Sequence, residues 1–212
     1  MSQPQSKLLD LKYQMFQYAS HHNHPVNVGI HMIFIPLIVW SSLVFAANTG
    51  PLIAYPSAAA VASGATIPVT LSKLFEFAVP NLAWVTMAGY VAYFIALDKP
   101  TGLLSVPIFL GLAKHATHFL ATNPKANRIA GYIHILSWIA QFIGHGVYEK
   151  RAPKVTDSVV QAALFGPYFV LWEILFFLGY RPQLKKELDV LVKADIAAFR
   201  AKKALDNKQK RQ

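Results

Sequence analysis

The segment Tyr18–Pro36 reads YASHHNHPVNVGIHMIFIP, and it places four of the chain's eight histidines at the start of an apolar stretch. Pro25 cannot donate a helical hydrogen bond, and it disfavours α geometry in the residue before it. The sequence therefore predicts an N-terminal helix over residues 1–24 that ends near His24. It also predicts a second helix over residues 25–47 that has Pro25 in its first turn and is capped by the residues just before it.

This corner decides how the histidines are arranged. His22 and His31 are nine positions apart, which would put them on opposite faces of one unbroken helix. A turn at Pro25 would instead direct both imidazoles to one point, with Asn27 sharing the helix face of His31. The alternative is a set of interfacial histidines that hydrogen-bond to the backbone at a helix corner.

A second polar segment, Trp138–Pro153, reads WIAQFIGHGVYEKRAP. On a continuous helix one stripe would hold His134, Trp138, Gln141, His145 and Glu149. His134 and His145 would lie about 16 Å apart along the axis, so one ion cannot bind both, and His145 is favoured. Gln141 and Glu149 would flank His145, to fix its tautomer or to supply an oxygen ligand. Gly144 and Gly146 would allow a close approach of another helix or of substrate. The alternative is a polar stripe buried between helices.

The composition is that of a membrane protein. The 212-residue chain is 54% hydrophobic and only 14% charged, against about 25% charged residues in a typical soluble domain. The net charge of +10 gathers at the ends and in loops, which favours anionic lipid headgroups over nucleic acid as the partner. With no cysteine, any metal must be held by His, Asp or Glu.

The apolar segments predict an all-α, polytopic membrane bundle of about four spans. These are residues 25–47, 81–97, 101–120 and 129–148. Residues 159–179 would re-enter the membrane or lie in its interface, and a basic amphipathic helix would follow over 182–212. The distribution of Lys and Arg favours cytosolic termini. We expect one membrane-embedded domain over 1–180 and a cytosolic tail over 181–212.

Further histidines lie on the predicted third span. His115 and His118 share a face with Lys114 and would supply further metal ligands or lie near headgroups without a role. Ligation by nitrogen and oxygen suits iron, manganese or zinc, and spacing alone does not choose among these metals.

At these two segments the sequence resembles the Mpo1-like family, formerly a domain of unknown function, and its fungal members in particular. The resemblance covers most of residues 8–190. The matching residues fall into two blocks, Tyr18-x-x-x-His22-x-x-Pro25-x-Asn27-x-x-x-His31 with Pro36, and Trp138-x-x-Gln141-Phe142-x-Gly144-His145 with Glu149 and Pro153.

The resemblance implies an endoplasmic-reticulum membrane enzyme, an iron(II)-dependent dioxygenase that shortens long-chain 2-hydroxy fatty acids by one carbon in phytosphingosine degradation. Its partners would be the fatty acid, O2 and the lipid bilayer. The family histidines carried over are His22, His31 and His145. We expect these three and His118 to bind Fe(II). Glu149 would be catalytic together with the three family histidines, and Tyr18, Asn27 and Gln141 would support them.

Charge alone suggests that Lys114, Lys150 or Arg151 steers the substrate carboxylate. Two other functions remain open. One is a zinc-type membrane hydrolase that uses the same histidines with Glu149 as general base. The other is a scaffold without activity, whose polar stripes join helices. A bis-histidine haem protein is a weaker alternative.

Overall fold

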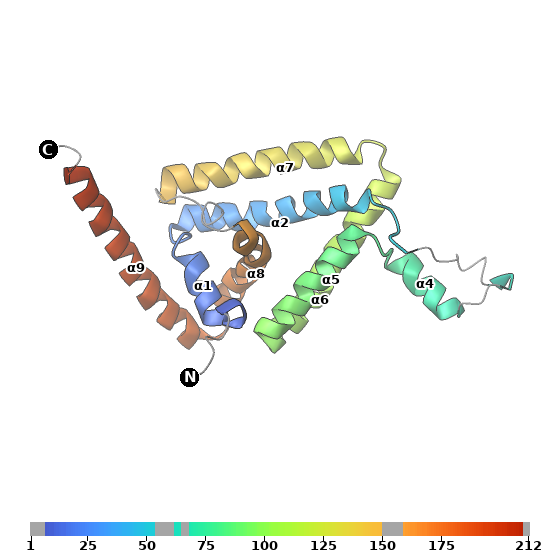
Figure 1. Cartoon of the computed structure of the whole chain (residues 1–212), viewed down its shortest axis with the longest axis horizontal. Coiled ribbons are helices and arrows are strands. Elements are labelled where there is room, and N and C mark those ends of the chain that lie inside the picture. The colour runs from blue at the N-terminus through green and yellow to red at the C-terminus, as the bar shows by residue number, and fades with distance from the viewer. Residues whose placement is uncertain (1–6, 54–61, 65–67, 150–158, 210–212) are drawn as a thin grey trace. The chain divides into compact units, whose positions relative to one another are not determined.

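The computed structural model describes residues 7–53, 62–64, 68–149 and 159–209 (Figure 1). Across these ranges the regular elements are helices and no strand occurs, which confirms the all-α prediction. The predicted basic cluster at Lys150 and Arg151 lies outside the described residues, as does Pro153. The chain divides into two compact units, one of residues 1–35 and 139–212 and one of residues 36–138.

The first unit begins with a short 3-10 turn, η1 (Lys7–Leu9), and helix α1 (Leu11–Ala19), which Asp10 caps by accepting a hydrogen bond from the N–H of Tyr13. The predicted end near His24 is wrong, because the helix stops five residues earlier. The Tyr18 carbonyl, which would accept the N–H of His22 in a longer helix, accepts the imidazole Nδ1–H of His22 instead. The backbone N–H of His22 bonds to Ala19 in a tighter turn.

Helix α2 (Pro25–Ala47) begins at the predicted proline. His24 acts as its cap, because its Nδ1 accepts a hydrogen bond from the N–H of Val26 at 3.2 Å. The boundary between the two units falls within this helix, at Pro36.

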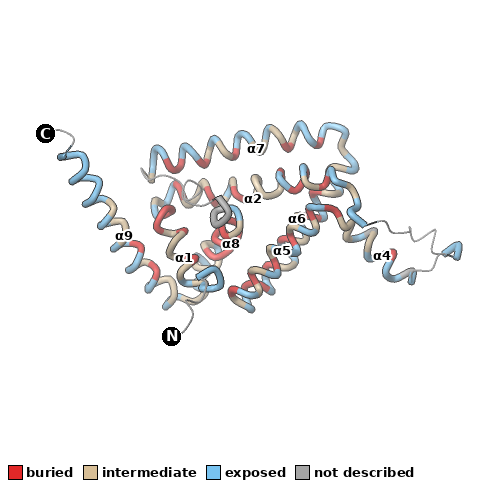
Figure 2. Tube along the Cα trace, viewed as in Figure 1, coloured by how far each residue is buried: buried red, intermediate tan, exposed pale blue. Residues whose placement is uncertain are grey.

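Helix α1 packs against α8 (Val159–Phe177) and α9 (Pro182–Gln209) in the first unit. Burial concentrates at this contact, whereas the C-terminal part of α9 is exposed (Figure 2). The buried side chains of this core are Met15, Tyr18, Phe165, Tyr168, Phe169, Trp172, Leu188 and Val192. An ion pair between Lys12 and Glu187 joins α1 to α9 on the exposed side.

The chain turns by 117° between α8 and α9. Gly179 takes a left-handed φ of 82°, its N–H bonds to the Phe176 carbonyl, and the N–H of Tyr180 bonds to the Leu175 carbonyl. This pair of bonds is the Schellman motif, which ends helices where glycine accepts the left-handed conformation. The bend follows α8, which is one continuous helix, so the expectation that residues 159–179 re-enter the membrane or lie in its interface stays a prediction.

In the second unit, α5 (Leu82–Leu97) and α6 (Lys99–Thr122) form a helical hairpin and lie side by side (Figure 1). Asp98 joins the two and caps α6 by accepting hydrogen bonds from Thr101. A Cβ at Gly102 would overlap the backbone of Ile95, so glycine is required for this close approach. A shorter helix, α4 (Val69–Phe77), precedes the hairpin.

Within the described ranges, two helices, α2 and α6, are long and apolar enough to cross a membrane, and α8 with α9 would make a third if that bent pair is one span. Helix α5 has 16 residues, which at about 1.5 Å per residue is shorter than a hydrocarbon core of about 30 Å. Helix α7 (Ala126–Ile143) has 18 residues and continues into a π-helical turn, η2 (Gly144–Glu149).

Candidate metal centre

Three histidines from separate elements of the first unit meet in its interior. His22 lies in the corner between α1 and α2, His31 on α2, and His145 on the π-helical turn. Each offers one ligand nitrogen, and these nitrogens lie within 4.8 Å of one another. The three side chains are only 3–4% exposed. Imidazoles packed this closely, away from water, form the kind of cluster that binds a transition metal.

The ring of His22 is held in one orientation and one tautomer. Its Nδ1 lies 2.8 Å from the carbonyl oxygen of Tyr18, and because a carbonyl only accepts, Nδ1 carries the proton. The ring also stacks on the phenol of Tyr18, with centroids 4.2 Å apart and an interplanar angle of 7°. Nε2 is therefore left as the nitrogen with a free lone pair.

His31 repeats this arrangement one helix later. Its Nδ1 lies 2.8 Å from the carbonyl oxygen of Asn27, again four residues earlier in the chain. Histidines that bind metal usually donate their second ring N–H to a carbonyl or carboxylate, which fixes the tautomer. Both His22 and His31 have this second contact, so the backbone alone presents two Nε2 atoms to one point.

His145 reaches the cluster through the π-helical turn. The stripe predicted for a continuous α-helix is wrong beyond Ile143, because the wider turn changes the direction in which Gly144–Glu149 project. A Cβ at Gly144 would overlap Oδ1 of Asn27, so the close approach expected at this glycine occurs. The neighbouring Gly146 has open space, so no helix approaches it among the described residues, and an approach of substrate there stays a prediction.

Glu149 lies at the N-terminus of α2 instead of flanking His145 on a shared helix face. Its Oε2 accepts hydrogen bonds from the backbone N–H groups of Asn23 (3.1 Å) and His24 (2.9 Å) and from Nδ2 of Asn27 (3.2 Å). A carboxylate is favoured there by the unpaired N–H groups and the dipole of the helix. Glu149 therefore ties the His145 turn to the corner that carries His22.

Several buried polar atoms on α2, α7 and the π-helical turn have no hydrogen-bond partner among the described residues. They are Nδ1 of His145, Oδ1 of Asn27, and both amide atoms of Gln141. A buried polar group left unpaired costs about 1–3 kcal/mol, so such groups concentrate where a ligand, ion or water belongs. Together with the two anchored Nε2 atoms, these unpaired groups fit a metal ion and a polar ligand.

The electrostatics keep the cluster neutral. Burial, followed by the proximity of His31 and His145, holds the pKa of His22 well below its usual range. The same burial raises the pKa of the Tyr18 phenol. Neutral imidazole is the form that binds metals, so the site needs no change of protonation at neutral pH. His21 is also buried and interacts with His22, and it lies outside the matching motifs.

The other predicted residues lie in the second unit. His118 is exposed on α6, and its role as a ligand stays a prediction. His134 accepts a hydrogen bond from Nε1 of Trp138 at 3.0 Å, so its Nδ1 donates to Ser41 at 2.9 Å. His115 accepts from Nε1 of Trp40 at 2.8 Å. His134 and His115 thus connect neighbouring helices by hydrogen bonds, as the scaffold hypothesis expected of the polar stripes.

Of the three residues expected to steer the substrate carboxylate, Lys114 is the one that the structure describes. Lys114 lies 3.7 Å from the ring centroid of Phe77 in a cation–π contact of the second unit. Lys150 and Arg151 lie outside the described residues.

Comparison with known proteins adds two findings. A family described as "Mpo1-like: 2-hydroxy-palmitic acid dioxygenase Mpo1-like" matches residues 8–178. The "2-hydroxy-palmitic acid dioxygenase MPO1" of Saccharomyces cerevisiae is 31% identical over 186 residues, which cover 86% of this chain and 89% of the yeast protein. No solved structure matches the chain.

Proposed function

Because the chain belongs to the Mpo1-like family, we propose that it is an oxidoreductase, an iron(II)-dependent dioxygenase that shortens long-chain 2-hydroxy fatty acids by one carbon. The observation that carries this proposal is the buried group of His22, His31 and His145. The activity in the name of the yeast relative requires a centre that binds O2 and a hydroxy acid. A neutral three-histidine site inside a membrane-associated helical protein suits that requirement.

The three donors are all imidazoles, and this set fits iron(II) although it contains no carboxylate. Imidazole nitrogens suit iron, zinc and copper, and the family's reaction favours iron among them. When bound, iron(II) would supply the one-electron chemistry that O2 needs to react with a closed-shell organic acid. Three protein ligands leave room for an oxygen atom of the substrate.

The chain's own residues hold this site rigid and dry. The carbonyls of Tyr18 and Asn27 keep two imidazoles in the binding tautomer, and Glu149 fixes the corner next to them. Phe169 packs on the rings of Tyr18 and His22, with centroids 4.5 Å and 5.7 Å away. This packing helps to keep the ring of His22 away from water.

The proposed reaction balances without an organic co-substrate. A 2-hydroxy acid of n carbons and O2 give a fatty acid of n−1 carbons, CO2 and water. C1 leaves as CO2, C2 becomes the new carboxyl carbon, and O2 takes up the four electrons released. The enzyme therefore needs no site for a second organic acid.

A long-chain acid partitions into lipid, so the site should lie at a membrane. We propose the topology expected from the sequence, with about four spans, both termini in the cytosol and a location in the endoplasmic reticulum. One membrane-embedded domain would cover residues 1–180, followed by a basic cytosolic helix.

The second candidate is a zinc hydrolase built on the same three histidines, since three imidazoles also suit catalytic zinc. The hydrogen bonds that Oε2 of Glu149 accepts count against it, because they hold the residue expected to act as general base at the N-terminus of α2.

Purification without oxygen in mild detergent, metal analysis and an assay on 2-hydroxyhexadecanoic acid test the proposal. We expect iron to bind and pentadecanoic acid to form with one O2 consumed per product. Stoichiometric zinc without O2 consumption would favour the hydrolase, and the absence of any bound metal would favour the scaffold.

A further inference from the structure

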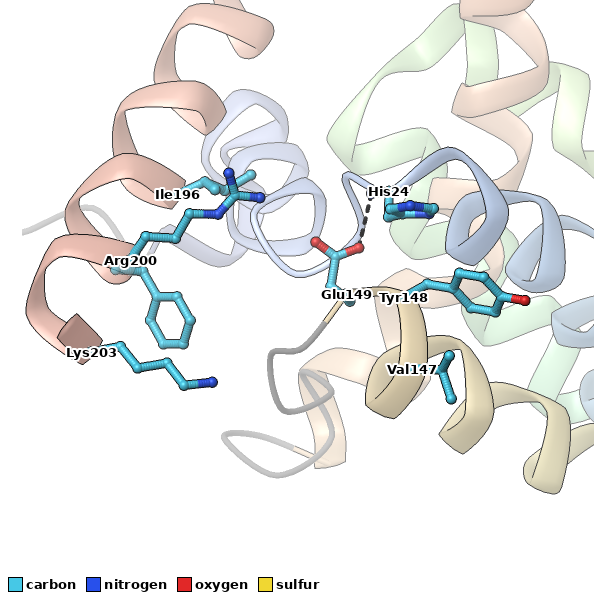
Figure 3. Close-up of a pocket in the computed structure, with 8 residues that line it drawn as sticks. His24, Val147, Tyr148, Glu149, Ile196, Arg200 and Lys203 are labelled. Carbon is cyan, nitrogen blue, oxygen red and sulfur yellow. Dashed lines mark hydrogen bonds between the residues drawn. The ribbon is translucent and has the colours of Figure 1, made fainter. Parts of the chain in front are cut away.

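A cavity of about 520 Å³ opens between α9 and the residues His24 and Val147–Glu149, within the first unit (Figure 3). This volume falls in the range of about 300–1,000 Å³ that is usual for small-molecule sites. Its lining consists of His24, Val147, Tyr148, Glu149, Ile196, Phe199, Arg200 and Lys203.

The lining continues directly from the segments that carry the metal ligands. Val147, Tyr148 and Glu149 follow His145 on the same π-helical turn, and His24 follows His22 by two residues. The opposite wall comes from α9, whose Arg200 and Lys203 extend toward the side where Glu149 lies (Figure 3). A molecule in this cavity therefore lies against both elements that hold the centre.

The charges of the lining favour an anion. Arg200 and Lys203 carry two positive charges and Glu149 one negative charge, which leaves a net charge of +1 with His24 neutral. The negative charge is already engaged by the N–H groups of Asn23 and His24. Arg200 makes no hydrogen bond or ion pair with any described residue, so its guanidinium is available to a ligand.

The remaining lining is apolar. Ile196, Phe199 and Val147 surround the charged groups with hydrocarbon and an aromatic ring. A cationic pair at the edge of an apolar surface matches an amphiphile whose anionic end adjoins an alkyl chain. A carboxylate forms two parallel hydrogen bonds with a guanidinium, which favours Arg200 as the primary contact.

We propose that this cavity receives the carboxylate end of the free 2-hydroxy fatty acid, with Arg200 and Lys203 as the residues that select an ionised acid over a neutral lipid. This inference rests on the proposed function and adds the part of the chain that recognises the substrate. It gives the C-terminal helix α9 a role in substrate selection.

Equilibrium binding of radiolabelled 2-hydroxyhexadecanoic acid to metal-free protein in neutral detergent tests this inference apart from turnover. We expect Arg200→Gln and Lys203→Gln each to weaken binding about twofold to fivefold, as for an exposed ion pair. Lys202→Gln, which removes the same charge from a neighbouring exposed position outside the lining, should bind as the wild type does. The methyl ester of the acid should bind weakly to every variant alike.

Kinetics on the iron-loaded enzyme give the second measurement. A role in selection raises KM in Arg200→Gln by a similar factor and leaves kcat largely unchanged. Equal affinity of wild type and Arg200→Gln for the acid would overturn the inference. So would displacement of the acid by equimolar phosphatidylserine, which would identify the cavity as a lipid-headgroup site. If the acid binds in an Arg200-dependent way but no shortened product forms, the proposed reaction fails and the binding site stands.

Discussion

Oε2 of Glu149 accepts a hydrogen bond from the backbone N–H of His24 at 2.9 Å, across 125 positions of sequence. The same oxygen accepts the N–H of Asn23, so one carboxylate closes the N-terminus of α2 and fixes it to the turn that carries His145. The three histidines of the candidate centre come from two distant parts of the chain, and this contact directly links those parts. Glu149 therefore sets the relative position of the ligands.

Glu149→Gln should weaken metal binding about tenfold to a hundredfold, which is the usual effect of disturbing the groups that orient metal ligands. The amide keeps the shape of the side chain but loses the charge that strengthens the bonds to backbone N–H groups. Metal titration of the apoprotein measures the effect. Glu187→Gln, which removes an equally negative but exposed partner of Lys12, is the matched control and should titrate as the wild type does. Unchanged affinity in Glu149→Gln would show that the link is not needed for metal binding.

Replacing any of the three central histidines should abolish the site. We expect His22→Ala, His31→Ala and His145→Ala each to retain less than about a tenth of the bound metal and to lose turnover, because two imidazoles hold an ion far less tightly than three. Metal analysis after desalting measures retention. His115→Ala, on the second unit, is the control that should keep full occupancy.

His118 needs a measurement of its own. If it contributes a fourth ligand, as the sequence suggested, His118→Ala will lose metal as the three central variants do. If it retains metal fully, the site consists of three histidines.

The elements that depend on local chemistry could be predicted from the sequence. The start of α2 at Pro25 follows from the covalent structure of proline, and the apolar helices follow from composition. Sequence reasoning placed His22, His31 and His145 together because a corner and a second polar segment were both visible in the pattern. The resemblance to the family added which histidines belong to one site.

The missed features depend on contacts that spacing does not encode. The end of α1 is set by an imidazole that takes over the carbonyl of Tyr18, and histidine is not a recognised helix stop signal. The π-helical turn at Gly144–Glu149 breaks the 3.6-residue period on which the predicted stripe rested. The position of Glu149 at the N-terminus of α2 depends on that turn, and its role in catalysis stays a prediction.

Iron should stabilise the folded protein measurably. A ligand that binds only the native state adds about 2.7 kcal/mol when its concentration is a hundred times its Kd. We expect Fe(II), added without oxygen, to raise the thermal unfolding midpoint of the wild type and a chelator to reverse the shift. His145→Ala should show no shift, and the same midpoint with and without metal in the wild type would contradict a native metal site.

The two glycines beside His145 provide a matched pair for the packing of the site. A Cβ at Gly144 would overlap Oδ1 of Asn27, which is fully buried, whereas a Cβ at Gly146 meets nothing within 4 Å. Gly144→Ala should therefore destabilise the protein by about 1–3 kcal/mol, the usual range for overpacking, and should displace the Asn27 segment that carries His31. Gly146→Ala should be neutral or slightly stabilising, because alanine restricts the unfolded chain more than glycine does. Thermal unfolding in detergent compares the two, and metal titration reports whether the loss reaches the site. Equal stability of both variants would contradict the close contact between the π-helical turn and α2.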